Sequence, residues 1–278
     1  MGRLITFEME KNNSIFLIRH AESEFNIHAK KAREAGEDLL PLKYLPELVD
    51  CSISPNGVEQ AQTVSKKLAQ ENITIVITSP LRRCLQTTKL LFENHKNKPK
   101  VIVWPIVREI FESSCDIPDD IEIIKKEFPD YDFSAFDSHK DLHMWAFETF
   151  VNETLKEDLL KLISEQFKDV EERNKSYRTR LAKKMFESYP SLCEKGHHVR
   201  ERTLIAKQLL KEKVKELKEG ERLALVSHSA FLIRFTGKAF DENGFTTDGR
   251  YFKNCDVVEY NLTTDSIESE YSIHVQQS

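Results

Sequence analysis

The sequence predicts an α/β fold: a three-layer α/β/α sandwich with a mostly parallel sheet and a helical insertion. Through the first third of the chain, short β-branched or apolar runs alternate with amphipathic helical patterns. The same alternation returns after a long charged interval at about 111–198, where strand patterns are missing. We therefore expect a single domain over residues 1–278, interrupted by a mostly helical insertion at about 111–198.

The first part of the chain supplies three strand–helix pairs. We expect strands at 15–18, 73–77 and 101–104, and helices at 23–35, from 55 onward and after 80. Ser54 and Pro55 signal a helix start, because serine caps an amino terminus and proline suits the first helical position. Ser79 and Pro80 are expected to cap the next helix in the same way, and Gly36 to end the first.

The last part of the chain resumes the pattern. We expect a helix at 199–218 with a solvated charged face. Arg202 on this helix is expected in solvent, with the pocket as the alternative. Strands are expected at 223–226, 257–262 and 271–275. Because strands joined through helices run parallel, the sheet should be largely parallel.

Composition limits the possible functions. The chain is 40% hydrophobic and 31% charged, as in soluble domains, and its formal net charge of −5 argues against a nucleic-acid partner. A small anionic substrate is still compatible, since a local pocket can be positive on an acidic protein. No apolar run is long enough for a membrane span, and the first ten residues do not resemble a signal peptide. Five scattered cysteines without a Cys-x-x-Cys pair predict free thiols and a cytoplasmic protein. The sequence predicts no particular oligomeric state.

Polar candidates follow four of the expected strands. The first strand ends in Arg19 and His20, and residues 79–83 (SPLRR) follow the second. Glu109 comes after the third strand, and His228 directly follows the fourth. Because the carboxyl ends of neighbouring parallel strands share one edge of a sheet, these side chains are expected to converge.

The residue types point to phosphate chemistry. Arginine offers a planar fork of donors that matches phosphate oxygens. Neighbouring guanidinium groups disfavour the imidazolium form, so His20 can keep a lone pair and attack phosphorus. Arg19, Arg82 and His228 would then hold the three equatorial oxygens of the transition state. Arg82 directly follows the expected cap, so we expect it in the pocket and Arg83 in solvent.

A carboxyl group is expected to serve as the general acid. We assign this role to Glu109, since a nearby phosphate dianion raises its pKa and keeps a proton available for the leaving oxygen. Glu112, one helical turn further on, is the alternative. In the second half-reaction the carboxylate would take a proton from water. The arginines supply positive charge, so neither a metal nor a cofactor is expected.

Four segments carry a family resemblance. Residues 16–26 (FLIRHAESEFN), 54–61 (SPNGVEQA), 78–87 (TSPLRRCLQT) and 226–229 (VSHS) resemble, in order, the motifs of the histidine phosphatase superfamily, in the branch of the phosphoglycerate mutases. The resemblance covers the sheet-forming parts, about two thirds of the chain. It implies a phosphoglycerate mutase-like fold and a phosphohistidine intermediate.

The resemblance also implies roles for single residues. His20 would be the phosphorylated residue, and Glu109 the proton donor. The phosphate pocket would be lined by Arg19, Asn26, Arg82 and His228.

One departure bears on the reaction. Mutase members of the family carry an Arg-Phe-x-Gly-Trp segment shortly after the first motif, whereas this chain has HAKKAR at 28–33. A phosphatase must admit water that a mutase excludes, and we predict a phosphatase. A mutase-type phosphotransferase and a non-catalytic phosphate-binding protein remain as alternatives. The expected partner is a small phosphorylated substrate or a phosphoprotein, with specificity arising from residues 111–198.

Overall fold

The fold is built on one mixed sheet. The computed structural model describes residues 13–137, 145–146, 179–180, 182–184, 187 and 193–271. The strands are β1 (Ser14–Arg19), β2 (Ile73–Thr78), β3 (Lys100–Val103), β4 (Arg222–Ser227), β5 (Val257–Asn261) and β6 (Ser266–Tyr271). They form a six-stranded sheet in the order β3-β2-β4-β1-β5-β6.

Four neighbouring strands run parallel. β3 pairs with β2, β2 with β4, and β4 with β1, all in the same direction. At the β1 edge, β5 pairs antiparallel with β1, and β6 pairs antiparallel with β5. The carboxyl ends of the four strands that precede the candidate residues therefore lie along one edge, as the sequence predicted.

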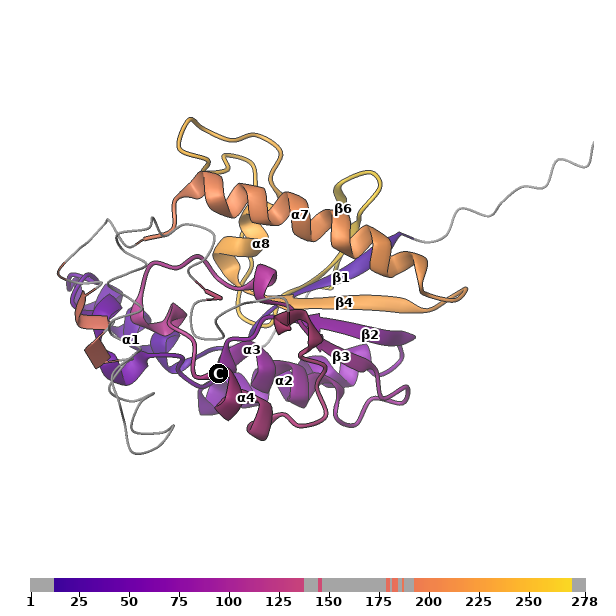
Figure 1. Ribbon diagram of the computed structural model, residues 1–278, viewed down its shortest axis with the longest axis horizontal. Helices are drawn as coiled ribbons and strands as arrows, with labels where there is room; N and C mark the ends of the chain where they lie inside the picture. Colours follow the sequence, from indigo (N-terminus) through magenta and orange to yellow (C-terminus); the bar gives the residue numbers. More distant parts are fainter. Residues whose placement is uncertain are drawn as a thin grey trace, which may run out of the picture.

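Helices cover both faces of the sheet, which confirms the three-layer architecture (Figure 1). In that view α7 (Gly196–Lys215) and α8 (Ser229–Thr236) lie above the sheet, and α2 (Pro55–Leu68) and α3 (Arg82–Phe92) lie below it. The side chains of β1 alternate between the two cores. Ile15 and Leu17 join the α7–α8 core, whereas Phe16 and Ile18 join the α2–α3 core.

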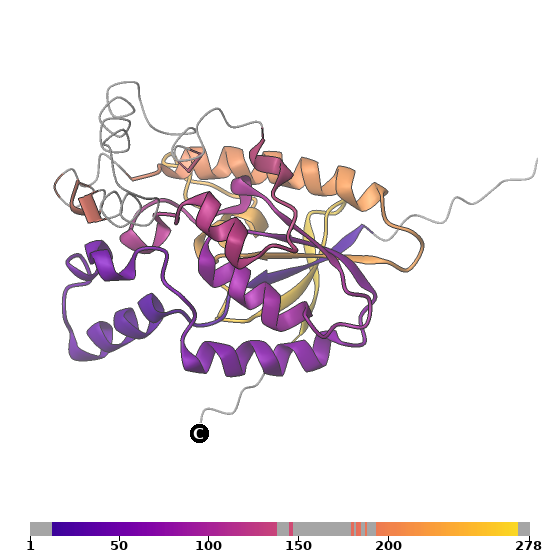
Figure 2. The ribbon, with the colours of Figure 1, turned by 60° about the horizontal axis from the view of Figure 1, so that its bottom comes forward.

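Helix α1 (Glu24–Ala35) stands beside the sheet rather than on either face (Figure 2). It begins at Ser23, whose side chain accepts from the backbone of Asn26 in a capping box. It ends at Gly36, whose φ of 70° is the left-handed conformation that glycine adopts at low cost. Both ends match the sequence prediction. Since α1 directly follows β1, these caps fix the helix close to the strand's carboxyl end.

One local expectation was wrong, and a second lies mostly outside the described residues. Helix α3 has Leu81 as its N-cap with no side-chain cap, so Ser79 does not cap it. The hydroxyl of Ser79 lies 2.7 Å from Nε2 of His228 instead. The last strand is Ser266–Tyr271, earlier than expected, and residues 272–275 lie outside the described residues.

The described start of the expected insertion packs on the α/β core. Residues 111–137 hold α4 (Ile121–Glu127) and the 3-10 turns Ser114–Asp116 and Ser134–Phe136. Phe111, Phe128 and Phe136 pack there with Trp145 in a third apolar cluster. Most of the remaining expected insertion lies outside the described residues. In the part of the chain that the structure describes, no helix combines the length and apolarity that crossing a membrane requires.

Candidate active site

A cavity of about 300 Å³ is lined by five side chains of interest from distant parts of the chain. They are Arg19 and His20 after β1, Asn26 from α1, Arg83 from α3 and Glu109 from the loop that follows β3. The cavity thus brings together four residues that the sequence assigned to the site, and Glu112, the alternative acid, also lines it; Arg83 is the unexpected member. Such convergence at the carboxyl edge of a parallel sheet is typical of ligand sites in α/β proteins.

His20 is held in one tautomer. Its Nδ1 lies 2.7 Å from the carbonyl oxygen of Ala21, which can only accept, so Nδ1 carries the proton and Nε2 keeps the lone pair. The ring is 3% exposed. Burial lowers the pKa of His20 well below its usual value, and Arg83 and then Arg19 lower it further. At neutral pH the imidazole is therefore uncharged and able to attack an electrophile.

Arg19 offers an unused donor. Its Nη1 donates to the carbonyl oxygen of Phe252 at 2.7 Å, which fixes the guanidinium. Its buried Nε has no hydrogen-bond partner among the described residues. A buried, unpartnered N–H beside a cavity can donate to a bound anion.

Arg83, not Arg82, is the second guanidinium of the site, so both expectations for this pair were wrong. Arg83 is 3% exposed and donates from Nη2 to Asp116 at 3.0 Å. Arg82 does not line the His20 cavity and forms ion pairs with Asp119 and Glu127. The reason lies in the start of α3, which turns position 83 inward and position 82 toward these two carboxylates.

His228 lies beside His20 but not in the cavity wall. The two ring centroids are 5.1 Å apart, and His228 is completely buried. Its Nε2 lies 2.7 Å from Oγ of Ser79 and 3.4 Å from Sγ of Cys84. Burial, followed by Arg83, lowers the pKa of His228 well below its usual value. The uncharged imidazole of His228 thus packs against that of His20 on the side away from the cavity.

Asn26 has one end of its amide occupied. Its Oδ1 accepts from the backbone N–H of Ser23 at 3.2 Å and from Nδ2 of Asn254 at 3.0 Å. The NH₂ end is therefore the part of this side chain that can donate to an anion. Asn254, which the sequence analysis did not single out, also donates to the carbonyl oxygen of His20 at 3.2 Å.

Glu109 lies against the amino terminus of α8. Its carboxyl oxygens accept from the backbone N–H groups of Ala230 at 3.1 Å and Phe231 at 2.9 Å. Burial, and next the negative charge of Asp116, raise the pKa of Glu109. The alternative acid, Glu112, has a side chain that is 52% exposed and pairs with Lys43. The raised pKa favours the protonated form of Glu109, as the role of general acid requires.

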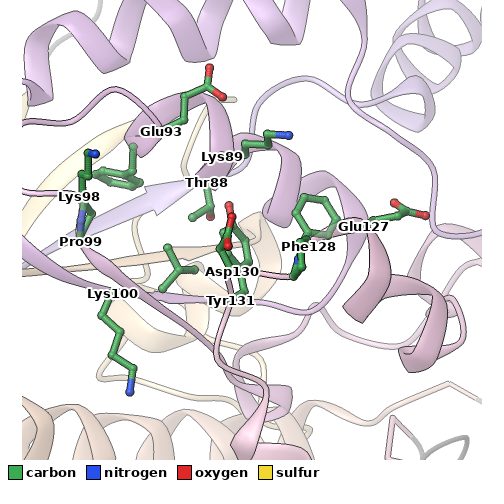
Figure 3. Close-up of a pocket in the computed structure, with 13 residues that line it drawn as sticks. Thr88, Lys89, Glu93, Lys98, Pro99, Lys100, Glu127, Phe128, Asp130 and Tyr131 are labelled. Atoms are coloured by element: carbon green, nitrogen blue, oxygen red, sulfur yellow. The ribbon is translucent and has the colours of Figure 1, made fainter.

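A second cavity of about 510 Å³ lies by α3 and the start of β3 (Figure 3). Three lysines and three carboxylates surround an aromatic floor that includes Phe128 and Tyr131. Among the residues with described positions, no histidine or arginine lines it, so these residues supply neither the nucleophile nor the guanidinium fork of the first cavity. Among the described residues there is also no cluster of three or more His, Cys, Asp or Glu suited to a metal ion.

Fold and cavity together define an α/β protein that presents an uncharged histidine and two buried guanidinium groups at the carboxyl edge of a parallel sheet. The model of the histidine phosphatase superfamily (branch 1) matches residues 15–150. This segment is thus similar to the superfamily that the sequence motifs indicated, and it contains three of the four motifs.

Curated relatives match parts of the chain. A protein of Schizosaccharomyces pombe named a probable phosphatase is 24% identical over 135 residues, covering 47% of this chain and 55% of the relative. A broad-specificity phosphatase of Saccharomyces cerevisiae is 33% identical over 93 residues, covering 32% of this chain and 34% of the relative. The matches thus span about half and about a third of the length of these relatives.

A solved structure extends the likeness of the fold. The structure of YhfR from Bacillus stearothermophilus aligns with a TM-score of 0.50 at 15% identity, covering 92% of this chain and 94% of that one. At this identity the likeness concerns the fold alone.

Proposed function

We propose that this protein is a metal-independent phosphatase that hydrolyses phosphomonoesters through a phosphohistidine at His20. The observation that carries the proposal is the His20 ring, whose proton is fixed on Nδ1 by Ala21 while its pKa is held low. A buried, uncharged imidazole beside the Arg19 and Arg83 guanidiniums is suited to attack an anionic ester. Both curated relatives are named phosphatases, which supports the same reaction class.

In the first half-reaction, Nε2 of His20 would form a bond to phosphorus as the bond to the ester oxygen breaks. The leaving oxygen would take its proton from Glu109, whose raised pKa favours the protonated form. Arg19 and Arg83 would stabilise the negative charge on the non-bridging oxygens. The products of this step are a free alcohol and phosphohistidine.

In the second half-reaction, water would attack the phosphohistidine while the Glu109 carboxylate takes a proton from it. The phosphorus–nitrogen bond breaks, inorganic phosphate leaves, and His20 and protonated Glu109 are restored. Arg19 and Arg83 supply the positive charge that a metal provides in other phosphatases.

The substrate is proposed to be a small phosphorylated molecule or a phosphorylated side chain of a protein. A cavity of about 300 Å³ accommodates groups of this size, and Phe25 and Leu39 add apolar wall to it. All five cysteines are free thiols, which supports our proposal of a cytoplasmic location.

Turnover of p-nitrophenyl phosphate by the purified full chain tests the proposal. We expect hydrolysis that is inhibited by vanadate, which adopts the geometry of the transferring phosphoryl group, and that is abolished by His20→Ala. His28→Ala is the matched control, because His28 is an exposed histidine of α1 outside the cavity. Full activity of His20→Ala would refute the assignment.

A second assay separates the alternatives. Incubation with 3-phosphoglycerate and bisphosphoglycerate should release inorganic phosphate. Isomer formation without phosphate release would identify a mutase instead. Binding of inorganic phosphate with no turnover of either substrate would identify a phosphate-binding protein.

A further inference from the structure

A buried cluster of charges lies next to the Glu109 loop, and the proposed chemistry does not use it. Glu194 precedes α7, and its side chain has no exposed surface. Its Oε1 accepts from Nε of Arg202 at 2.7 Å, and its Oε2 accepts from Nη1 of Arg108 at 2.7 Å and Nη2 of Arg202 at 2.9 Å. One carboxylate thus holds two guanidiniums that come from distant segments. Arg202 was expected in solvent and is instead 3% exposed, so that expectation was wrong.

Arg108 and Arg202 donate hydrogen bonds to the backbone around Glu109, the proposed acid. Nη1 of Arg108 donates to the carbonyl oxygen of Glu109 at 2.9 Å, and Nη2 of Arg202 to the same oxygen at 3.3 Å. Nη1 of Arg202 also reaches the carbonyl oxygen of Ile106 at 2.7 Å. The peptide on the carboxyl side of Glu109 is therefore fixed by two guanidiniums at once.

Glu194 also ties itself to this loop directly. Its Oε2 accepts from the backbone N–H of Phe111 at 3.2 Å, and its own N–H donates to the carbonyl oxygen of Phe111 at 2.8 Å. Contacts through Glu194 and the two arginines therefore reach both sides of Glu109. The loop then presents the Glu109 carboxyl to the amino terminus of α8 beside the cavity.

Glu194 is the only negative charge described in this cluster, and it neutralises part of the charge of Arg108 and Arg202. Burial acts to raise the pKa of Glu194, but Arg108 and Arg202 outweigh it and bring the pKa to about 2. Burial, and next the charge of Arg108, lower the pKa of Arg202 to about 10. Without the negative charge of Glu194, two buried guanidiniums would repel each other across the loop.

We propose that Glu194 is a positioning residue for the general acid, acting through Arg108 and Arg202 to hold Glu109 at the leaving oxygen. The inference rests on the proposed phosphatase function. Glu194 itself lines no part of the cavity and takes no part in bond making. Its loss should therefore impair proton donation more than phosphate binding or attack by His20.

The test compares two leaving groups in one enzyme preparation. Glycerol phosphate has an alkoxide leaving group that needs a proton, whereas p-nitrophenolate departs without one. General acid catalysis contributes about 10² to 10⁴-fold, so Glu194→Gln should lower kcat/KM for glycerol phosphate, which reports the first half-reaction, by at least about 30-fold. For p-nitrophenyl phosphate we expect kcat/KM to fall by less than about threefold, because this parameter does not include the hydrolysis of phosphohistidine, in which Glu109 acts as a base. The ratio of the two rates does not depend on how much of the protein is folded.

Glu259→Gln is the matched control. Glu259 pairs with Arg222 on the sheet, away from the cavity, so its loss should leave the ratio of the two rates unchanged. If Glu194→Gln does not fold, Arg202→Lys is the second variant. It keeps the positive charge but loses the paired hydrogen bonds from Nε and Nη2 to Glu194, and it should shift the ratio in the same direction. An equal loss of kcat/KM with both substrates would overturn the inference. Absence of phosphatase activity in the unaltered protein would instead refute the proposed function itself.

Discussion

Adjacent arginines at the start of α3 allow a sharp test of the site. Arg83 is buried beside the cavity, whereas Arg82 pairs with Asp119 and Glu127. The same substitution at both positions, Arg83→Gln and Arg82→Gln, changes charge and shape equally. Only the first should remove a guanidinium from the His20 cavity.

The magnitude follows from the surroundings of Arg83. Losing one preorganised donor to transition-state charge costs about 10² to 10³-fold in kcat, or about 3 to 4 kcal/mol. Stability should also fall by about 3 to 5 kcal/mol, because the buried Asp116 carboxylate loses its partner at 3.0 Å. For Arg82→Gln we expect kcat/KM to stay within about threefold of the unaltered enzyme.

The assay measures kcat/KM with p-nitrophenyl phosphate across pH, together with urea unfolding. Adding Asp116→Asn to Arg83→Gln removes both buried charges, and should restore much of the stability but not the activity. The pKa of His20 is lowered by burial and then by Arg83, so Arg83→Gln should raise it. The acid limb of the pH profile should therefore move to higher pH.

Two results would refute this reasoning. One is a loss of activity in Arg82→Gln as large as that in Arg83→Gln. The other is recovery of activity, along with stability, in the double variant. Either would mean that the Arg83 guanidinium has no direct part in binding the phosphoryl group.

Two further predictions concern stability. Gly57→Ala should destabilise the protein by about 1 to 3 kcal/mol, although alanine favours helices, because the new Cβ would lie 2.2 Å from the carbonyl oxygen of Glu22; equal or higher stability in thermal unfolding would contradict it. Burial lowers the pKa of His20 and His228. Below about pH 6.5 these histidines are therefore protonated in the unfolded chain but not in the folded protein, and the free energy of unfolding falls as the pH falls. Urea unfolding should show a loss of about 1 kcal/mol per histidine at pH 5.5, reduced in His228→Asn; no reduction in that variant would contradict the prediction.

The positions of most strands along the chain could be predicted because the sequence pattern of a buried strand is local. Residues 15–18 form a continuous apolar run, and their side chains face a core on both sides of the sheet. A buried parallel strand then delivers whatever follows it to the shared edge. Arg19, His20 and Glu109 could be placed at the site by this argument, to which the family resemblance added their roles.

The choice between Arg82 and Arg83 failed because it depends on the phase of one helix. Arg83 lies four residues before Thr87 and eight before Leu91, both of which are buried on α3. Arg82 lies four residues before Gln86, which is only partly buried. This periodicity was present in the sequence, but the expected cap at Ser79 placed the start of the helix too early and so led to the wrong face for Arg82 and Arg83.

The ion cluster around Glu194 could not be predicted from local patterns. Arg108 and Glu194 are separated by 86 positions, and their pairing exists only in the folded chain. A weaker signal did exist for Arg202, which lies three residues after Val199 and four before Ala206, both buried. The assumption that helix charges face solvent outweighed it. The complete burial of His228 behind His20 was likewise beyond local reasoning, since it depends on Ser79 and Cys84.

The most direct measurement is to trap the covalent intermediate. Rapid acid-free quenching of the enzyme during turnover of a ³²P-labelled phosphomonoester should yield labelled protein. The label should be stable in alkali, labile in acid and located by peptide mapping at His20, with none in His20→Ala. A label at another residue, or one that persists in His20→Ala, would contradict the account.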